Sequence, residues 1–153
     1  YLKDYQKAGE AWQEASRLAS APIWMQPLAA MAHSKGGAIE VAQALWLNQY
    51  QESTRAEVRE NARNHLLSIE VARDLWSLEV LLEKYRARTS LFPQNLRELV
   101  GGTRGRYRIV DPLGTPYQYD RATGTVRLSP ESKVRYLQVP PSYKEQLQSS
   151  IVD

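Results

Sequence analysis

The feature that most constrains the fold is an apolar pattern that occurs twice, 34 residues apart. It consists of a large apolar residue, an alanine and a tryptophan: Tyr5, Ala8 and Trp12 in the first copy, and Ile39, Ala42 and Trp46 in the second. Spacings of three and four residues place each set on one face of an α-helix. Helix pairs that repeat with this period bury their small residues where helices cross. We therefore expect the first fifty or so residues to form antiparallel helices, with a turn at Gly36 and Gly37.

This pattern resembles the second helix of the tetratricopeptide repeat. In that interpretation residues 1–19 hold the second helix of one repeat, and residues 22–34 and 39–51 form the next pair. His33 departs from the tyrosine that the family prefers, and Gln49 replaces an alanine. The resemblance implies a concave protein-binding surface. The candidate binding residues are Trp24, Met25 and His33, with Trp24 as an exposed anchor at the start of a helix. Helical spacing instead predicts core positions for the other tryptophans, Trp12, Trp46 and Trp76.

Helical sequence continues before the chain turns, and whether it breaks near residues 69–73 is left open. Thr54 and Glu57 form a capping-box pattern, which predicts a helix over residues 54–68. A broad apolar surface continues over residues 74–88, and this helix should end near Thr89 because Phe92 precedes a proline. Pro93 suits the first turn of a short helix. The inward-facing residues of that helix would be Leu96, Leu99 and Val100.

The sequence beyond Gly101 and Gly102 is typical of β-structure. Residues 106–110 alternate as a strand, and residues 116–120 and 125–128 flank a turn-forming loop and predict a hairpin. A further strand over residues 134–139 and a short helix starting at Ser142 would complete the chain.

Residues 78–128 resemble the soluble head of type II secretion pseudopilins and type IV pilins. The matching positions are Tyr85, Phe92, Pro93, Leu96, Leu99, Asp111, Pro112, Gly114, Pro116, Tyr117 and Tyr119, whereas Ser90 and Leu113 depart from the usual glycine and aromatic residue. The resemblance implies that the hairpin packs on the preceding helix. The apolar N-terminal helix of that family is missing, and residues 74–88 take its place. These matches predict a pseudopilin-like head joined to a helical repeat scaffold.

These patterns predict an α+β fold, with antiparallel helix pairs followed by a small antiparallel hairpin packed on a long helix. We expect a tetratricopeptide-like region over residues 1–73 and a pseudopilin-like head over residues 74–153, sharing the helix 74–88. The chain begins at Tyr1 within a predicted helix, so we expect it to be a fragment of a longer protein. No apolar run approaches the ~20 residues of a membrane span, so membrane attachment would need a segment outside this chain.

The side chains that support catalysis are sparse. The absence of cysteine excludes disulfides and thiolate chemistry, and His33 and His65, the only histidines, have no partner at metal-ligand spacing. Asp111 and Asp120 flank the hairpin and are better explained as turn caps than as part of a calcium site. We therefore expect no enzyme activity, cofactor, metal or small-molecule substrate.

The second half of the chain is basic. Residues 84–135 contain eleven Lys or Arg and four acidic residues. Arg104, Arg106 and Arg108 would share one face of a strand. This basic patch is consistent with binding to a polyanion or nucleic acid, but the absence of aromatic residues on the same face favours a charged sheet edge that resists pairing.

The leading hypothesis is a non-enzymatic interaction or scaffold module of a bacterial envelope assembly, in the periplasm or at the envelope. Its partners would be proteins, among them components of secretion systems or pili. The alternatives are a module that binds polyanions through the basic half, an enzyme with a site between the repeats and the head, for which the sequence offers no residues, and a cytoplasmic location.

Overall fold

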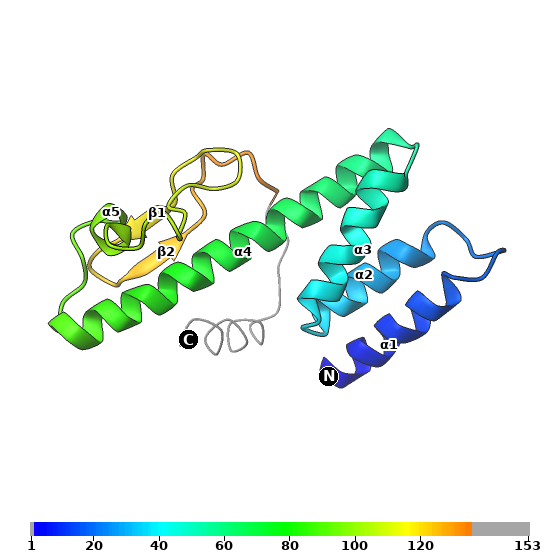
Figure 1. The fold of residues 1–153 in the computed structure, drawn as a ribbon, viewed down its shortest axis with the longest axis horizontal. Coiled ribbons are helices and arrows are strands. Elements are labelled where there is room, and N and C mark those ends of the chain that lie inside the picture. The colour runs from blue at the N-terminus through cyan, green and yellow to red at the C-terminus, as the bar shows by residue number, and fades with distance from the viewer. Residues whose placement is uncertain (1, 136–153) are drawn as a thin grey trace. The chain divides into compact units, whose positions relative to one another are not determined.

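The computed structural model describes residues 2–135 and divides them into two compact units, residues 2–69 and residues 70–134 (Figure 1). The described part of the chain contains five helices and one two-stranded antiparallel sheet, so the predicted α+β class is confirmed. The boundary between the units lies within helix α4 (Ala56–Thr89), between residues 69 and 70, whereas the sequence placed it between residues 73 and 74. None of the helices within residues 2–135 is both long and apolar enough to cross a bilayer.

The first unit contains helices α1 (Leu2–Ala15), α2 (Met25–Lys35) and α3 (Ile39–Glu52), followed by the beginning of α4. Helices α1 and α2 run antiparallel: the side-chain amide of Gln6 donates to the Gly36 carbonyl at 3.1 Å, and Gly9 lies against the ring of His33. The turn predicted between α2 and α3 is confirmed, and Gly37 adopts a φ of 85°, a conformation that glycine permits without strain.

Small residues allow the helices of this unit to pack closely. Ala29, Ala30 and Ala42 are fully buried, as are Ile39 and Trp46. The Trp46 ring stacks on the His65 ring of α4, with 4.0 Å between centroids and an interplanar angle of 3°. Of the other tryptophans predicted to be core, Trp12 and Trp76 are half-buried. The apolar repeat in the sequence thus forms most of the buried face of α3.

Helix α4 is continuous, so the helical segments expected over residues 54–68 and 74–88 are joined without the break that the sequence left open near residues 69–73. The intervening residues contain neither glycine nor proline, so nothing in the sequence terminates the helix there. The helix begins at Ala56, and the Ser53 hydroxyl accepts the N–H of Arg55 just before it. Its end at Thr89 is as predicted, and the next residue, Ser90, turns the chain with a φ of 62°.

The second unit combines the rest of α4 with the short helix α5 (Leu96–Val100) and strands β1 (Gln118–Asp120) and β2 (Thr125–Arg127). Asn95 caps α5, with its side-chain oxygen accepting the N–H of Glu98 at 3.0 Å. Pro93 was predicted in the first turn of α5, but it precedes the cap. Its ring is buried and its carbonyl accepts the hydroxyl of Tyr119 at 3.0 Å.

The strand predicted over residues 106–110 is wrong. Arg104 and Gly105 have φ angles of 52° and 75°, which turn the backbone immediately before it. Pairing along this segment is reduced to a single bridge between Val110 and Pro116, together with a hydrogen bond from the N–H of Tyr117 to the Ile109 carbonyl. A turning backbone cannot maintain the regular ladder that the alternating sequence predicted.

The hairpin of β1 and β2 is confirmed, with Tyr119 opposite Val126. Its loop docks on Phe92: Gly124 has a φ of 69°, and a Cβ at this position would lie 2.2 Å from the ring. Tyr117 and Val126 are buried below the hairpin. The predicted strand 134–139 and the helix from Ser142 extend into residues 136–153, outside the described residues.

Candidate protein-interaction surface

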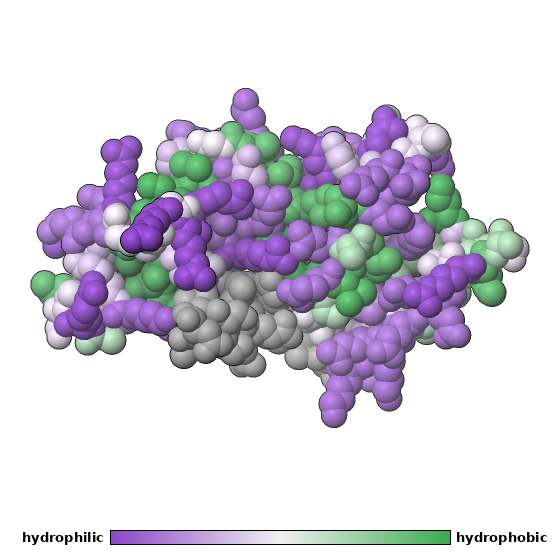
Figure 2. All heavy atoms as spheres, in the orientation of Figure 1, coloured by the Kyte–Doolittle hydropathy of each residue, from purple (hydrophilic) through white to green (hydrophobic). Residues whose placement is uncertain are grey.

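Large apolar side chains are exposed mainly in the first unit. They are Leu18, Ile23, Trp24, Leu28, Met31, Val41, Leu47 and Tyr50, whereas those in the second unit are Leu91 and Leu113. Apolar residues also appear at the surface over helices α1–α3 on the face shown in Figure 2. Clustered exposed apolar residues, unlike single ones, indicate an interaction surface.

Three of these residues form a line along α2, which we call the α2 stripe: Trp24, Leu28 and Met31. Their side chains are 51%, 37% and 38% exposed, and their spacing of four and three residues places them on one side of the helix. The opposite side of α2 is buried through Ala29, Ala30 and His33. Because that side is packed, α2 cannot rotate to bury the stripe.

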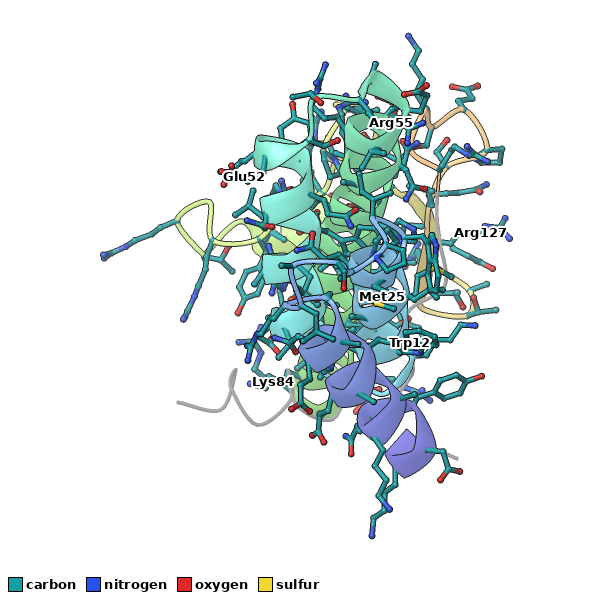
Figure 3. The ribbon with its side chains drawn as sticks, turned by 90° about the vertical axis from the view of Figure 1, so that its right-hand side faces the viewer. Trp12, Met25, Glu52, Arg55, Lys84 and Arg127 are labelled. Carbon is teal, nitrogen blue, oxygen red and sulfur yellow. The ribbon has the colours of Figure 1, made fainter. Side chains whose placement is uncertain are left out.

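Trp24 is held in place although half of it is exposed. Its ring makes an edge-to-face contact with the ring of Trp12 on α1, with 5.9 Å between centroids and 68° between planes. Figure 3 shows the neighbouring helices, with Trp12 on α1 and Met25 at the start of α2. An aromatic pair of this kind restricts the exposed ring before any partner arrives, which lowers the entropy lost on binding.

The other two predicted binding residues occupy different environments. Met25 is half-buried in the first turn of α2. His33 is 4% exposed and lies at the crossing of α1 and α2, where its Nε2 is 2.9 Å from the Gln13 side-chain oxygen. Burial lowers the pKa of His33, against a smaller opposing effect of Glu10. His33 therefore packs beneath the exposed surface of α2 and is too buried to contact a partner directly.

A hollow in the first unit lies at the α3–α4 connection. Its volume is about 230 Å³, and its walls include Ile23, Gln26, Gln49 and Val58. Glu52 and Arg55, labelled in Figure 3, also line it. The side-chain oxygen of Gln49 is buried there without a hydrogen-bond partner.

The second unit is organised around a polar cluster on α4. Arg108 contacts Glu70 at 3.1 Å and Asp74 at 3.0 Å, and the Tyr117 hydroxyl donates to Asp74 at 2.8 Å. Burial raises the pKa of Asp74, although the hydrogen bonds from Tyr117 and Arg108 oppose this effect. Burial, together with the hydrogen bond to Asp74, also raises the pKa of Tyr117. These bonds attach residues 108–117 to α4.

The three arginines of the predicted basic patch occupy different environments. Arg104 and Arg106 are exposed on the glycine-containing turn, whereas Arg108 is bound to two carboxylates. Because residues 104–108 are not a strand, the three side chains do not share the predicted strand face. One of the three positive charges is thus paired with carboxylates of the chain itself.

The two aspartates near the hairpin serve as turn caps. Asp111 accepts the N–H groups of Leu113 at 2.8 Å and Thr115 at 3.0 Å, and Asp120 accepts the N–H of Ala122 at 2.9 Å. Burial would raise the pKa of Asp111, but hydrogen bonds, first among them that from Ser132, lower it. Residues 2–135 contain no group of three or more histidine or acidic side chains placed to hold a metal ion.

The sequence interpretation missed Leu28 and Met31, although the signal was present. Residues 24, 28 and 31 follow helical spacing, which would have placed these two residues beside Trp24 once α2 was assigned. The interaction of Asp74 with Arg108 and Tyr117 had no such signal, because it depends on how the chain folds back after α5.

The chain matches no family model, and no curated protein or solved structure is significantly similar to it.

Proposed function

We propose that this protein is a non-enzymatic protein–protein interaction module whose binding surface is the α2 stripe. The observation that carries the proposal is the line of Trp24, Leu28 and Met31, exposed on a helix whose opposite face is packed. An exposed tryptophan held by an aromatic neighbour is typical of residues that dominate binding energy at interfaces.

The more specific proposal is a tetratricopeptide-like scaffold carrying a pseudopilin-like head, acting in a bacterial envelope assembly. It is supported by the 34-residue apolar repeat in the first unit and by the packing of the motif residues in the second. Four of these motif residues make contacts within the second unit. The ring of Phe92 lies against Gly124 of the hairpin loop, the Pro93 carbonyl accepts the Tyr119 hydroxyl, and Asp111 caps a turn.

Site-specific photocrosslinking in cells that naturally make the protein tests the proposed surface. A photoreactive phenylalanine in place of Leu28 is expected to give a discrete protein adduct. The same residue in place of Leu113, which is similarly exposed at 40% but lies in the second unit, is the matched control. Equal adducts at both positions, or none at position 28, would contradict the proposal.

A further inference from the structure

The α2 stripe has a length and spacing that suit one kind of partner. Trp24, the N-cap residue of α2 with helical backbone angles, is seven residues before Met31, which corresponds to about 10 Å along the axis. Two turns of an opposing helix cover this length, with apolar residues at spacings of three, four and seven. A strand would instead need a row of free backbone groups, and the backbone groups in the interior of α2 are hydrogen-bonded within the helix.

The charged side chains of the chain segment that carries the stripe have one sign. Between Glu14 and Glu40 the chain contains Arg17 and Lys35 and no acidic residue. Lys35 lies on the same side of α2 as the stripe, four residues beyond Met31, and its ammonium group is 5.5 Å from the centre of the Tyr5 ring. Arg17 comes seven residues before Trp24 in the sequence, between α1 and α2, and is exposed. Acidic residues at both ends of a partner helix would complement this arrangement.

The same charges argue against two other occupants. A second copy of the chain, placed with its α2 antiparallel, would bring basic ends of like sign together. A helix that lies on a membrane surface needs a larger apolar face and several basic residues beside it, and the stripe contains three large apolar residues, with two basic residues between Glu14 and Glu40.

We infer that the α2 stripe binds an amphipathic helix with an apolar ridge of about two turns and acidic residues at both ends. This inference rests on the proposed function and specifies its partner. Trp24 anchors the ridge, Leu28 and Met31 extend the contact, and Arg17 and Lys35 orient the helix through its ends.

Selection from a library of random 16-residue peptides displayed on phage, with the whole chain as bait, tests the inference. The expected consensus has apolar residues at helical spacing flanked by Asp or Glu. A synthetic consensus peptide should gain helical circular dichroism on binding, and its affinity should fall about tenfold or more with Trp24→Ser in the protein. Leu113→Ser, in the second unit, is the matched control and should leave the affinity unchanged.

Charge reversal then tests the polar part of the contact. The double variant Arg17→Glu, Lys35→Glu should weaken binding of the consensus peptide. It should strengthen binding of a version of the peptide whose acidic residues are replaced by lysine. Since both residues are exposed, the variant is expected to fold, which its circular dichroism spectrum verifies.

The possible outcomes separate the two proposals. Peptides that depend on Trp24 but are basic or not helical would overturn the inferred partner and leave the interaction surface standing. If no selected peptide depends on Trp24, both proposals fail. Dimerisation abolished by Met31→Ser, or Trp24-dependent binding to phosphatidylglycerol vesicles, would likewise overturn the helical partner.

Discussion

The two units of this protein are held together in different ways. In the first, alanines and Gly9 bring helices close, and side chains too large for those crossings remain at the surface. In the second, hydroxyl, carboxylate and guanidinium groups fasten the chain onto α4 and α5, through Asp74, Tyr117 and Glu98. The exposed apolar residues lie mainly in the unit whose helices cross at alanines and Gly9.

This difference indicates how each unit responds to substitution. Apolar packing should be sensitive to volume, since a cavity or an added methyl group has no compensating partner. A polar cluster should instead be sensitive to the loss of individual hydrogen bonds, because a buried donor or acceptor left behind must remain without water. Four measurements, from the largest expected effect to the smallest, test this comparison.

Trp46→Ala should lower the free energy of unfolding by about 4 kcal/mol, because it leaves a large cavity in the first unit and removes the stack on His65. Denaturant titration followed by circular dichroism measures the change. Trp24→Ala is the control and should change stability by less than about 1 kcal/mol, since that ring is half exposed. Similar losses for the two variants would show that the α2 stripe belongs to the core.

Asp74→Ala should cost about 2 to 3 kcal/mol, because the buried Tyr117 hydroxyl loses its acceptor and Arg108 keeps only Glu70. Asp74→Asn retains an acceptor oxygen and should cost less. Glu70→Ala removes a more exposed carboxylate and should cost under about 1 kcal/mol. A larger loss for Glu70→Ala than for Asp74→Ala would contradict the proposed order within the cluster.

Gly9→Ala should destabilise by about 1 to 2 kcal/mol, although alanine normally favours a helix over glycine. The reason is that the new Cβ would lie 2.9 Å from Nδ1 of His33. Gly102→Ala places its Cβ in open space and is the control. A thermal midpoint for Gly9→Ala at or above that of the original protein would mean that the α1–α2 crossing adjusts without strain.

Stability should fall by about 1 kcal/mol between pH 7.5 and pH 5.0 because of His65, after allowance for its partial exposure. Burial lowers the pKa of His65 from 6.5 to about 4. Between these values the unfolded chain takes up a proton that the folded protein does not, so unfolding becomes easier as the pH falls, and the effect levels off below pH 4.

His65→Phe keeps an aromatic ring beside Trp46 and removes the titration. Urea titrations of both proteins at the two pH values isolate the contribution of His65. The same pH dependence in the variant would assign it to other groups, among them His33, whose pKa burial also lowers.

The sequence predicted the first unit well where periodicity and turn residues agreed. The Tyr5 and Ile39 patterns located α1 and α3, and the two glycines located the turn before α3. At α4 the sequence left open whether the helix breaks, because a capping box suggested one start and the apolar run after Asp74 suggested another, while nothing between them could end a helix. The continuity of α4 could have been predicted from the absence of glycine and proline in residues 69–73.

In the second unit, local signals and long-range contacts diverged. The hairpin followed from its turn residues, and the end of α4 followed from Phe92 and Pro93. The failed strand did alternate, but Arg108 pairs with Asp74 and Glu70, residues distant in sequence. The candidate surface was predicted through Trp24 alone, since whether Leu28 and Met31 are exposed depends on which face of α2 its neighbours cover.

Because Gly9 and His33 lie so close together, the size of the residue at each position limits the size of the residue at the other. A side chain larger than hydrogen at position 9 requires a smaller ring or no ring at position 33. In proteins that descend from the same ancestor, the sizes of these two residues should therefore vary inversely. Such a covarying pair would persist after most of the surrounding sequence had diverged, and would identify distant relatives of this fold.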